Sequence, residues 1–236
     1  MEITPQSIAG FIDHTDVKPD ATENDIKKLC AEAVKYGFHS VCVTPYRVHS
    51  AAEFLKSTNR YPEGRGNKVE IICVVGFPFG VATTEEKIEE AIIAKSDGAT
   101  EIDMIINIGA VKEHDWNFIK KEIHAISQAI KPLGLKVIME IGFLTKPELI
   151  KACQIAEIAG AKFVKTSTGY GPRKPTTEDI KIMRQAVGLK IGVKASGGIH
   201  DFKKAKAMIE AGATRIGTSS SLQIIGALEP KKKEVE

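Results

Sequence analysis

Two lysines lie in short apolar segments of this 236-residue chain, where a cation is costly to bury. Lys165 stands in FVKTSTGYGP (163–172), and Lys194 stands 29 residues later in IGVKASGG (191–198). Either lysine alone is explained by a stem that lets its amine reach a loop carboxylate. Two such lysines close together would disfavour each other's charge, and burial acts in the same direction. An uncharged lysine amine condenses with a carbonyl to form a Schiff base, so the pair indicates imine-forming lyase chemistry.

An aspartate in another apolar segment provides a partner for proton transfer. Asp103 lies in TEIDMII (100–106), and strand alternation places it on the same face as Glu101 and Ile105. A carboxylate within reach of the lysines would act as a general acid or base. Lys165, Lys194 and Asp103 are therefore the candidate catalytic residues.

Three glycine-bearing turns follow later apolar segments: TSTGYGP (166–172), ASGGIHD (195–201) and GTSSSL (217–222). Gly197, Gly198 and Gly217 would let backbone N–H groups approach an anion. Ser219 and Ser220 can donate hydroxyls while they open a helix in SSLQIIGAL. Any one of these glycines is explained by a tight turn, but the three turns together indicate a phosphate site. The substrate should then carry both a carbonyl and a phosphate.

Helical and β-rich segments alternate along the chain and would position these residues. Eight short β-rich segments have the marker residues Asp13, Cys42, Val75, Asp103, Glu140, Lys165, Lys194 and Gly217, which are 23 to 37 residues apart. The segments between them have helical periodicity, as in TENDIKKLCAEAVKYG, with Thr22 as the expected N-cap. Eight such units predict a single (β/α)₈ TIM barrel over residues 1–236, with its site at the carboxyl ends of the strands. An open doubly wound sheet is the alternative, but no GxGxxG follows the first strand.

Composition excludes several other classes of protein. The six histidines form no HxH or HExxH pair, so we expect no metal site. The four cysteines are scattered and form no CxxC, as is typical of a reducing compartment. No apolar run approaches a membrane span and no signal peptide is evident, so we expect a cytoplasmic protein without membrane contact. The net charge of +3 is spread along the chain apart from a lysine-rich tail from about residue 229, so we expect no nucleic-acid partner.

An ordered series of motifs between about residues 8 and 222 resembles the deoxyribose-phosphate aldolase family. The motifs are IDHTDVKPDAT, VCVTP, VVGFPFG, EIDMIINIGA, KVIMEIGFL, FVKTSTGYGP, VKASGGI and RIGTSS. The resemblance implies a (β/α)₈ class I aldolase. Such an enzyme cleaves 2-deoxy-D-ribose 5-phosphate to D-glyceraldehyde 3-phosphate and acetaldehyde, without a metal or organic cofactor. It also implies a role in deoxyribonucleotide catabolism, and we expect a homo-oligomer, either a dimer or a tetramer.

The resemblance also assigns roles to individual residues. It implies that Lys165 forms the Schiff base, that Lys194 perturbs it, and that Asp103 shuttles protons with a water molecule. Cys42 would line the pocket near the reacting carbons. The implied substrate- and phosphate-binding residues are Thr166, Gly169, Gly197, Gly198, Gly217, Ser219 and Ser220.

The chain departs from the family pattern in two places. Asp16 and Val17 stand where the first motif usually has leucines, and YGPRKPTT replaces a commonly glycine-rich stretch. Neither departure involves the catalytic lysines. Two alternative functions remain at this stage: a class I aldolase for another phosphorylated sugar, and a sugar-phosphate-binding barrel without catalysis.

Overall fold

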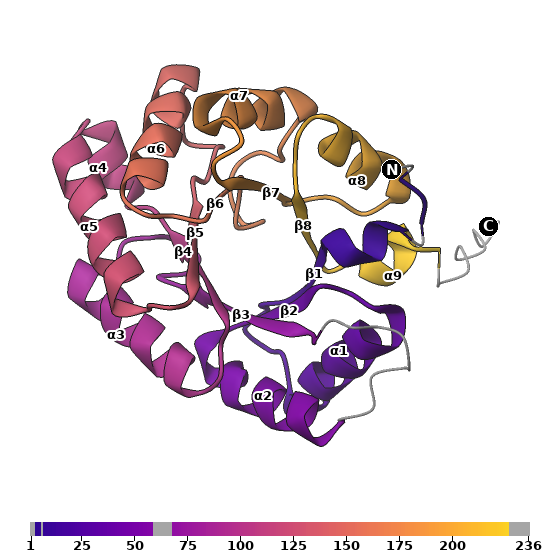
Figure 1. Ribbon diagram of the computed structural model, residues 1–236. Helices are drawn as coiled ribbons and strands as arrows, with labels where there is room; N and C mark the ends of the chain where they lie inside the picture. Colours follow the sequence, from indigo (N-terminus) through magenta and orange to yellow (C-terminus); the bar gives the residue numbers. More distant parts are fainter. Residues whose placement is uncertain (1–2, 6, 59–67, 227–236) are drawn as a thin grey trace, which may run out of the picture.

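Eight parallel strands form one closed barrel in the order in which they occur along the chain (Figure 1). The structure is a computed structural model, and it describes residues 3–5, 7–58 and 68–226. The strands are β1 (Ile12–Asp16), β2 (Ser40–Val43), β3 (Glu70–Val75), β4 (Glu101–Ile105), β5 (Gly134–Ile138), β6 (Phe163–Lys165), β7 (Gly192–Ser196) and β8 (Arg215–Thr218). The predicted TIM barrel is confirmed. The lysine-rich tail from about residue 229 lies outside the described residues.

Helices surround the barrel as an outer ring (Figure 1). They are α1 (Glu23–Tyr36), α2 (Val48–Ser57), α3 (Thr84–Ser96), α4 (Ile108–Lys112), α5 (Trp116–Ala129), α6 (Lys146–Ile158), α7 (Thr177–Val187), α8 (Phe202–Glu210) and α9 (Ser221–Ile224), with 3₁₀ turns η1 (Ser7–Phe11) and η2 (Pro45–Arg47). The sequence did not predict α2 and α4. Among the described residues, no helix combines the length and the apolar character needed to cross a membrane.

Reciprocal caps fix where several helices begin. A threonine N-cap accepts from the backbone N–H three residues later, and the carboxylate at that position bonds back to the threonine N–H. This capping box opens α1, α3, α6 and α7, with the N-caps Thr22, Thr83, Thr145 and Thr176. Gly37 ends α1 at φ 69°, a left-handed conformation that glycine adopts without strain.

Strand alternation separates an outer apolar core from a mostly polar barrel interior. Val41, Val43 and Val193 belong to the large cluster between strands and helices, as predicted. Cys42 instead joins Ile72 in a small apolar cluster inside the barrel. Charged side chains, described below, occupy much of the remaining interior.

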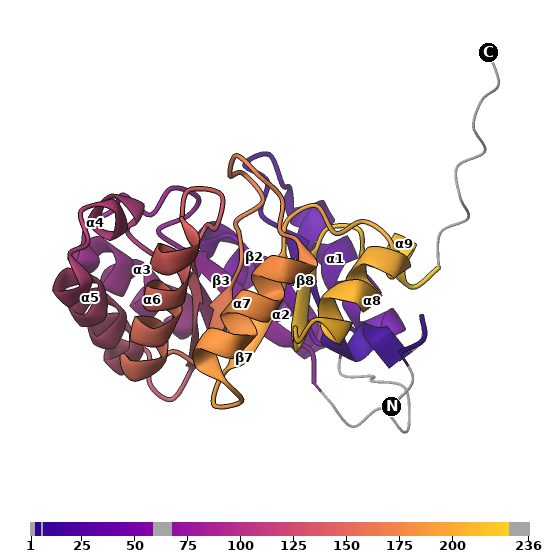
Figure 2. The same ribbon diagram turned by 90° about the horizontal axis from the view of Figure 1, so that it is seen from above.

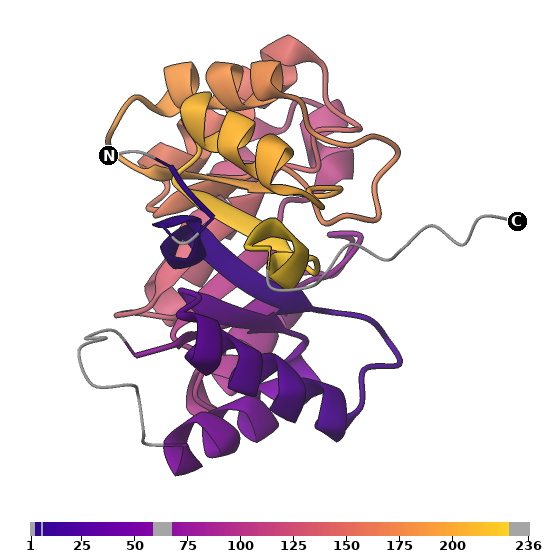
Figure 3. The same cartoon turned by 90° about the vertical axis from the view of Figure 1, so that its right-hand side faces the viewer.

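The loops after the strands gather at one end of the barrel. The loop after β1 and the loop between β6 and α7 project from the same end, upward in Figure 2 and to the right in Figure 3. In this fold the carboxyl ends of the strands carry the site, so these loops are its walls.

Candidate active site

Lys165, Lys194 and Asp103 meet inside the barrel. Lys165 and Lys194 are directly paired in the register of β6 and β7. Each Nζ atom lies 2.8 Å from the same oxygen, Oδ2 of Asp103, which reaches across from β4. Asp103 and Lys194 are fully buried, and Lys165 is 4% exposed. The structure therefore brings together the three residues that the sequence singled out, with a carboxylate between the two amines.

A second carboxylate holds Lys194 in its charged form. Lys194 Nζ lies 2.6 Å from Asp13 Oδ2, in addition to its contact with Asp103. Burial alone would lower the pKa of Lys194, but the Asp103 and Asp13 carboxylates outweigh it and raise that pKa. The expectation that burial and a like charge disfavour the charge of each lysine is therefore wrong for Lys194, because the sequence did not reveal Asp13 beside it.

Lys165 differs from Lys194 in both access and partners. Its amine contacts one carboxylate oxygen, on Asp103, and its side chain lines the cavity at the barrel mouth. Lys194 does not line that cavity among the residues described. Of the two amines, Lys165 is therefore the one placed to meet a carbonyl compound.

Further charged residues lie inside the barrel below this centre. Lys136 Nζ lies 3.1 Å from Asp103 Oδ1 and 2.5 Å from Glu101 Oε2. Arg215 Nη1 lies 2.9 Å from Asp13 Oδ1 and 3.4 Å from Glu101 Oε2. The sequence analysis did not single out Lys136 or Arg215. Strand alternation could have found Lys136, because it is paired with Asp103 in the register of β5 and β4.

The charges of this interior almost balance. Among the described residues, the network joins four cations (Lys136, Lys165, Lys194 and Arg215) to three carboxylates (Asp13, Glu101 and Asp103). His39 also contacts Arg215, but burial and the Arg215 charge lower its pKa, so it adds no cation at neutral pH. One lysine can therefore lose its proton without leaving a carboxylate unbalanced.

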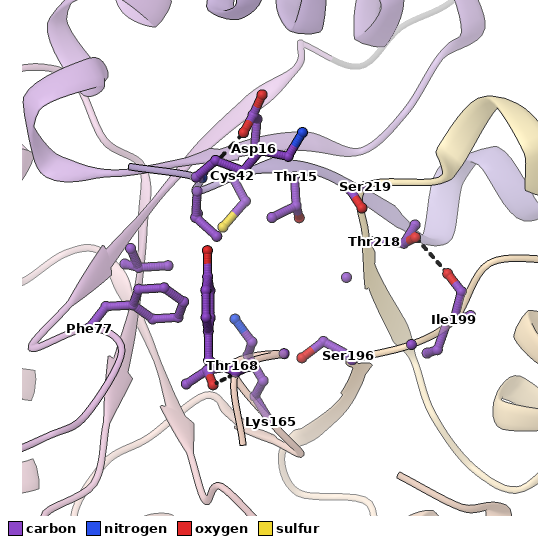
Figure 4. A pocket seen from close by; sticks show the side chains of 18 of the residues that line it. Thr15, Asp16, Cys42, Phe77, Lys165, Thr168, Ser196, Ile199, Thr218 and Ser219 are labelled. Carbon is purple, nitrogen blue, oxygen red and sulfur yellow. Dashed lines mark hydrogen bonds between the residues drawn. The ribbon is translucent and has the colours of Figure 1, made fainter. Parts of the chain in front are cut away.

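A cavity of about 300 Å³ opens above Lys165 (Figure 4). One side of it is mainly apolar and includes Cys42 and Phe77. Burial raises the pKa of the Cys42 thiol, so this side carries no thiolate at neutral pH. The other side holds Ser196, Thr218 and Ser219, and Lys165 lies between the two.

The predicted substrate- and phosphate-binding residues divide into two groups. Those that line the cavity are Gly169, Gly197, Gly198, Gly217 and Ser219. Thr166 and Ser220 are not among the lining residues. Thr166 is buried, and its hydroxyl donates to the Ser196 carbonyl at 2.8 Å. The Ser220 hydroxyl lies 2.9 Å from Nδ1 of His200.

Three side chains that can carry positive charge also line the cavity: Lys18, Lys174 and His200. The Lys174 stem passes over Gly198, where a Cβ would come within 2.5 Å of Lys174 Cδ. Gly198 also has φ +64°, a left-handed conformation that favours glycine. Lys174 belongs to one of the departures from the family pattern, and it brings a cation to the glycine-rich wall.

A buried glutamate holds the loop after β6. Glu140 is 1% exposed and has φ 48°, which is uncommon for a residue with a side chain. Its Oε2 accepts from the Thr168 backbone N–H at 3.0 Å and from the Thr168 hydroxyl. Gly171 passes so close to Glu140 that a Cβ there would lie 2.3 Å from Oε1. The sequence marked Glu140 only as part of a strand segment, and it lies two residues beyond β5.

Within residues 3–5, 7–58 and 68–226, no three His, Cys, Asp or Glu side chains are grouped so that they could hold a metal ion. The arrangement instead offers an accessible amine, a shared carboxylate and a charged second lysine. Such a set can form an imine and move protons beside it.

Comparison with known proteins points to the same chemistry. Residues 8–227 match the model of the "DeoC/LacD family aldolase". The chain is 53% identical over 226 residues to the deoxyribose-phosphate aldolase of Aciduliprofundum boonei, covering 95% of this chain and 98% of that one. It is 50% identical to the enzyme of the same name from Thermococcus gammatolerans, covering 92% and 95%. A tetrameric deoxyribose phosphate aldolase structure from Aeropyrum pernix has a TM-score of 0.86 at 30% identity, covering 95% and 92%.

Proposed function

The chain belongs to the DeoC/LacD family of aldolases, and from that premise we propose that it cleaves 2-deoxy-D-ribose 5-phosphate through a Schiff base on Lys165. The products are D-glyceraldehyde 3-phosphate and acetaldehyde, and the reaction is reversible. The single observation that carries the assignment to Lys165 is its position: its amine lines the cavity, whereas two carboxylates hold the Lys194 amine below.

The reaction begins when the uncharged Lys165 amine attacks the C1 aldehyde of the open-chain sugar. Loss of water gives a protonated imine, which withdraws electrons from the C2–C3 bond. As that bond breaks, its electron pair forms an enamine, and the C3 hydroxyl loses its proton to become the aldehyde of glyceraldehyde 3-phosphate. Protonation of the enamine carbon and hydrolysis then release acetaldehyde and return the free amine.

Asp103 is the group best placed to carry the protons of these steps. Its Oδ2 atom lies 2.8 Å from both lysine amines, so a proton released by one can pass to the other. Burial opposes the charge of Asp103, but Lys136, Lys165 and Lys194 outweigh it and hold the pKa of the carboxyl well below its usual range. Asp103 therefore accepts protons only transiently, as a relay should.

The phosphate end of the sugar would lie against the glycine-rich wall. Gly197, Gly198 and Gly217 expose backbone there, Ser219 supplies a hydroxyl, and Lys174 supplies a positive charge. The apolar side with Cys42 would face the two carbons that become acetaldehyde. A phosphate at one end and a carbonyl over Lys165 at the other fix the sugar in the cavity.

The direct test is reduction of the imine in the presence of substrate. The protein is incubated with acetaldehyde and sodium borohydride, digested, and examined by mass spectrometry. We expect a stable two-carbon addition on Lys165, and its absence in Lys165→Ala together with loss of turnover. Modification of Lys194 instead, or turnover by Lys165→Ala above about one per cent of the wild type, would overturn the assignment.

The wider context is also proposed. The Aeropyrum pernix structure is described as a tetramer, which supports a homo-oligomer here as well. Light scattering of the purified protein tests this. A cytoplasmic location and a role in deoxyribonucleotide catabolism stay predictions.

A further inference from the structure

A hydrogen-bonded chain of three side chains joins the start of α9 to β1 and α1. The Ser221 hydroxyl lies 2.8 Å from His14 Nδ1, and His14 Nε2 lies 2.8 Å from Glu32 Oε2. Ser221 is fully buried, His14 is 4% exposed, and the Glu32 side chain is 18% exposed. The three residues come from three different elements, so the chain exists only when the barrel has closed.

The direction of the chain follows from its two ends. An ionised carboxylate only accepts hydrogen bonds, so the proton of a neutral His14 ring is on Nε2 and points at Glu32. Nδ1 is then the acceptor for the Ser221 hydroxyl. Burial lowers the pKa of His14, although Glu32 opposes this, and the ring is therefore neutral at pH 7.

The order serine, histidine, carboxylate is that of a hydrolase triad, but these three hydrogen-bonded side chains cannot act as one. A nucleophilic serine must reach the carbonyl of a substrate. Ser221 is 0% exposed, and it lines neither the main cavity nor the smaller one beside His14 and Glu32. The chain must therefore position something rather than react.

The segment that it positions is the turn between β8 and α9. Thr218 and Ser219 line the main cavity, shortly before Ser221. On one side, the Thr218 hydroxyl donates to the Ile199 carbonyl at 2.7 Å, which fastens the turn to the loop after β7 (Figure 4). On the other side, Ser221 fastens it to His14 of β1. The turn is thus held from both flanks of the cavity.

We propose that the Glu32–His14–Ser221 chain is a positioning device, which fixes Ser219 in the cavity wall and so sets the affinity for the phosphate end of the substrate. The inference rests on the proposed function for the identity of that substrate. Its residues lie outside the reacting centre, because His14 alternates with the inward Asp13 and faces the helices.

The test compares Ser221→Ala with a matched loss of a buried hydroxyl elsewhere. Ser127→Ala is the control, since Ser127 on α5 is 9% exposed and its hydroxyl donates only to the Gly160 carbonyl among the bonds described. Loss of the Ser221 hydroxyl, which lies 2.8 Å from His14 Nδ1 and 3.4 Å from the Thr218 carbonyl, should raise KM for 2-deoxyribose 5-phosphate about three- to tenfold in Ser221→Ala. We expect kcat, and kcat/KM for unphosphorylated 2-deoxyribose, to stay within about twofold, because the Ser221 hydroxyl does not contact the reacting centre. Ser127→Ala should change neither KM for 2-deoxyribose 5-phosphate nor kcat/KM for unphosphorylated 2-deoxyribose.

Glu32→Ala provides a second variant at a partly exposed position, so the test does not depend on folding of Ser221→Ala. Its control is Glu157→Ala, whose side chain is 17% exposed and pairs with Lys190 at 2.9 Å. Glu32→Ala should raise the same KM, by less than Ser221→Ala, because His14 keeps its contact to Ser221 but loses its fixed tautomer. The quantity compared is kcat/KM for the phosphorylated sugar divided by kcat/KM for the unphosphorylated sugar. If this ratio in Ser221→Ala and Glu32→Ala equals that of their controls, the hydrogen-bonded chain has no positioning role. If Ser221→Ala does not fold, the result for Glu32→Ala alone decides.

Titration calorimetry with inorganic phosphate separates this inference from the proposed function. A wild-type protein that cleaves neither sugar would refute the proposed function. Weaker phosphate binding by Ser221→Ala than by Ser127→Ala would support the positioning device even then. Equal phosphate affinity in these two variants would overturn it.

Discussion

Replacing Asp103 by asparagine separates imine formation from proton transfer. The substitution keeps the shape of the side chain but removes the carboxylate that both lysine amines contact at 2.8 Å. Lys194 retains Asp13 at 2.6 Å, and Lys165 loses the carboxylate that it contacts. The amide that replaces the carboxylate can still accept a hydrogen bond, yet it cannot take up a proton.

The expected loss follows from the role of the carboxylate. A positioned acid or base contributes about two to four powers of ten in rate, which is about 3–5 kcal/mol of activation free energy. We therefore expect kcat of Asp103→Asn to fall by about 100- to 10,000-fold. Trapping of acetaldehyde by borohydride should persist at a reduced rate, because the amine of Lys165 is still present in the cavity.

Stability supplies an independent measure of the same contacts. Breaking a buried ion pair costs up to about 3–5 kcal/mol in the free energy of unfolding. The lysines hold the pKa of Asp103 well below its usual value, although burial opposes them. Its stabilising contribution is therefore complete above about pH 4, the usual range of an unfolded aspartate, and is lost as the pH falls further. In urea unfolding, the difference between wild type and Asp103→Asn should be constant from about pH 7 to pH 5 and narrow below about pH 4.

Two results would refute this reasoning about Asp103. Full kcat in Asp103→Asn would show that protons travel by another route. Loss of both turnover and borohydride trapping in a folded variant would show that the carboxylate is needed to form the imine and not only to move protons beside it. Circular dichroism of the variant must match the wild type for either result to count.

Three further predictions concern the surroundings of the centre. Lys194→Met should lower kcat by at least about 100-fold and slow the borohydride trapping of acetaldehyde on Lys165, because both the proton donor and the excess cation of the interior are lost; unchanged kcat would contradict this. Lys174→Ala should raise KM for the phosphorylated sugar about ten- to a hundredfold, since a hydrogen bond to a charged group contributes about 1.5–3 kcal/mol. An equal change for unphosphorylated 2-deoxyribose would place the phosphate elsewhere. Glu140→Gln should lower kcat/KM about tenfold, because it weakens the hydrogen bonds to Thr168. Hydrogen exchange of residues 168–171 should be faster than in the wild type. Unchanged exchange would show that Glu140 does not hold this loop.

The fold could be predicted because its signals are local. Each capping box lies within four consecutive residues, as between Thr22 and Asp25, and is visible without knowledge of any contact. Alternation within a strand is equally local, and it correctly placed Val41 and Cys42 on opposite faces. The helices α2 and α4 were missed because neither has a side-chain cap paired with a long apolar stripe.

The loop residues of the site could not be placed in the same way. A strand fixes which side a residue faces, but β6 ends at Lys165 and β8 ends at Thr218. Beyond those points the direction of a side chain depends on the turn, and two predicted substrate-binding residues, Thr166 and Ser220, do not line the cavity. Thr166 bonds to Ser196, and Ser220 bonds to His200. These partners are 20 to 30 residues distant, so no local pattern marks them.

The charge of the interior is the least local property of all, and it decides how the lysines can react. Considered alone, Lys165 and Lys194 repel each other. Strand alternation could have added Lys136 to the count, but no local pattern shows that Asp13 and Arg215 join the same network. In the structure, Asp103 and Glu101 join these residues into one network across the closed barrel. A free amine at the cavity then does not depend on repulsion between two lysines. It depends on an interior that holds one more cation than carboxylate among the described residues, so that one lysine can lose its proton while each carboxylate still has a cationic partner.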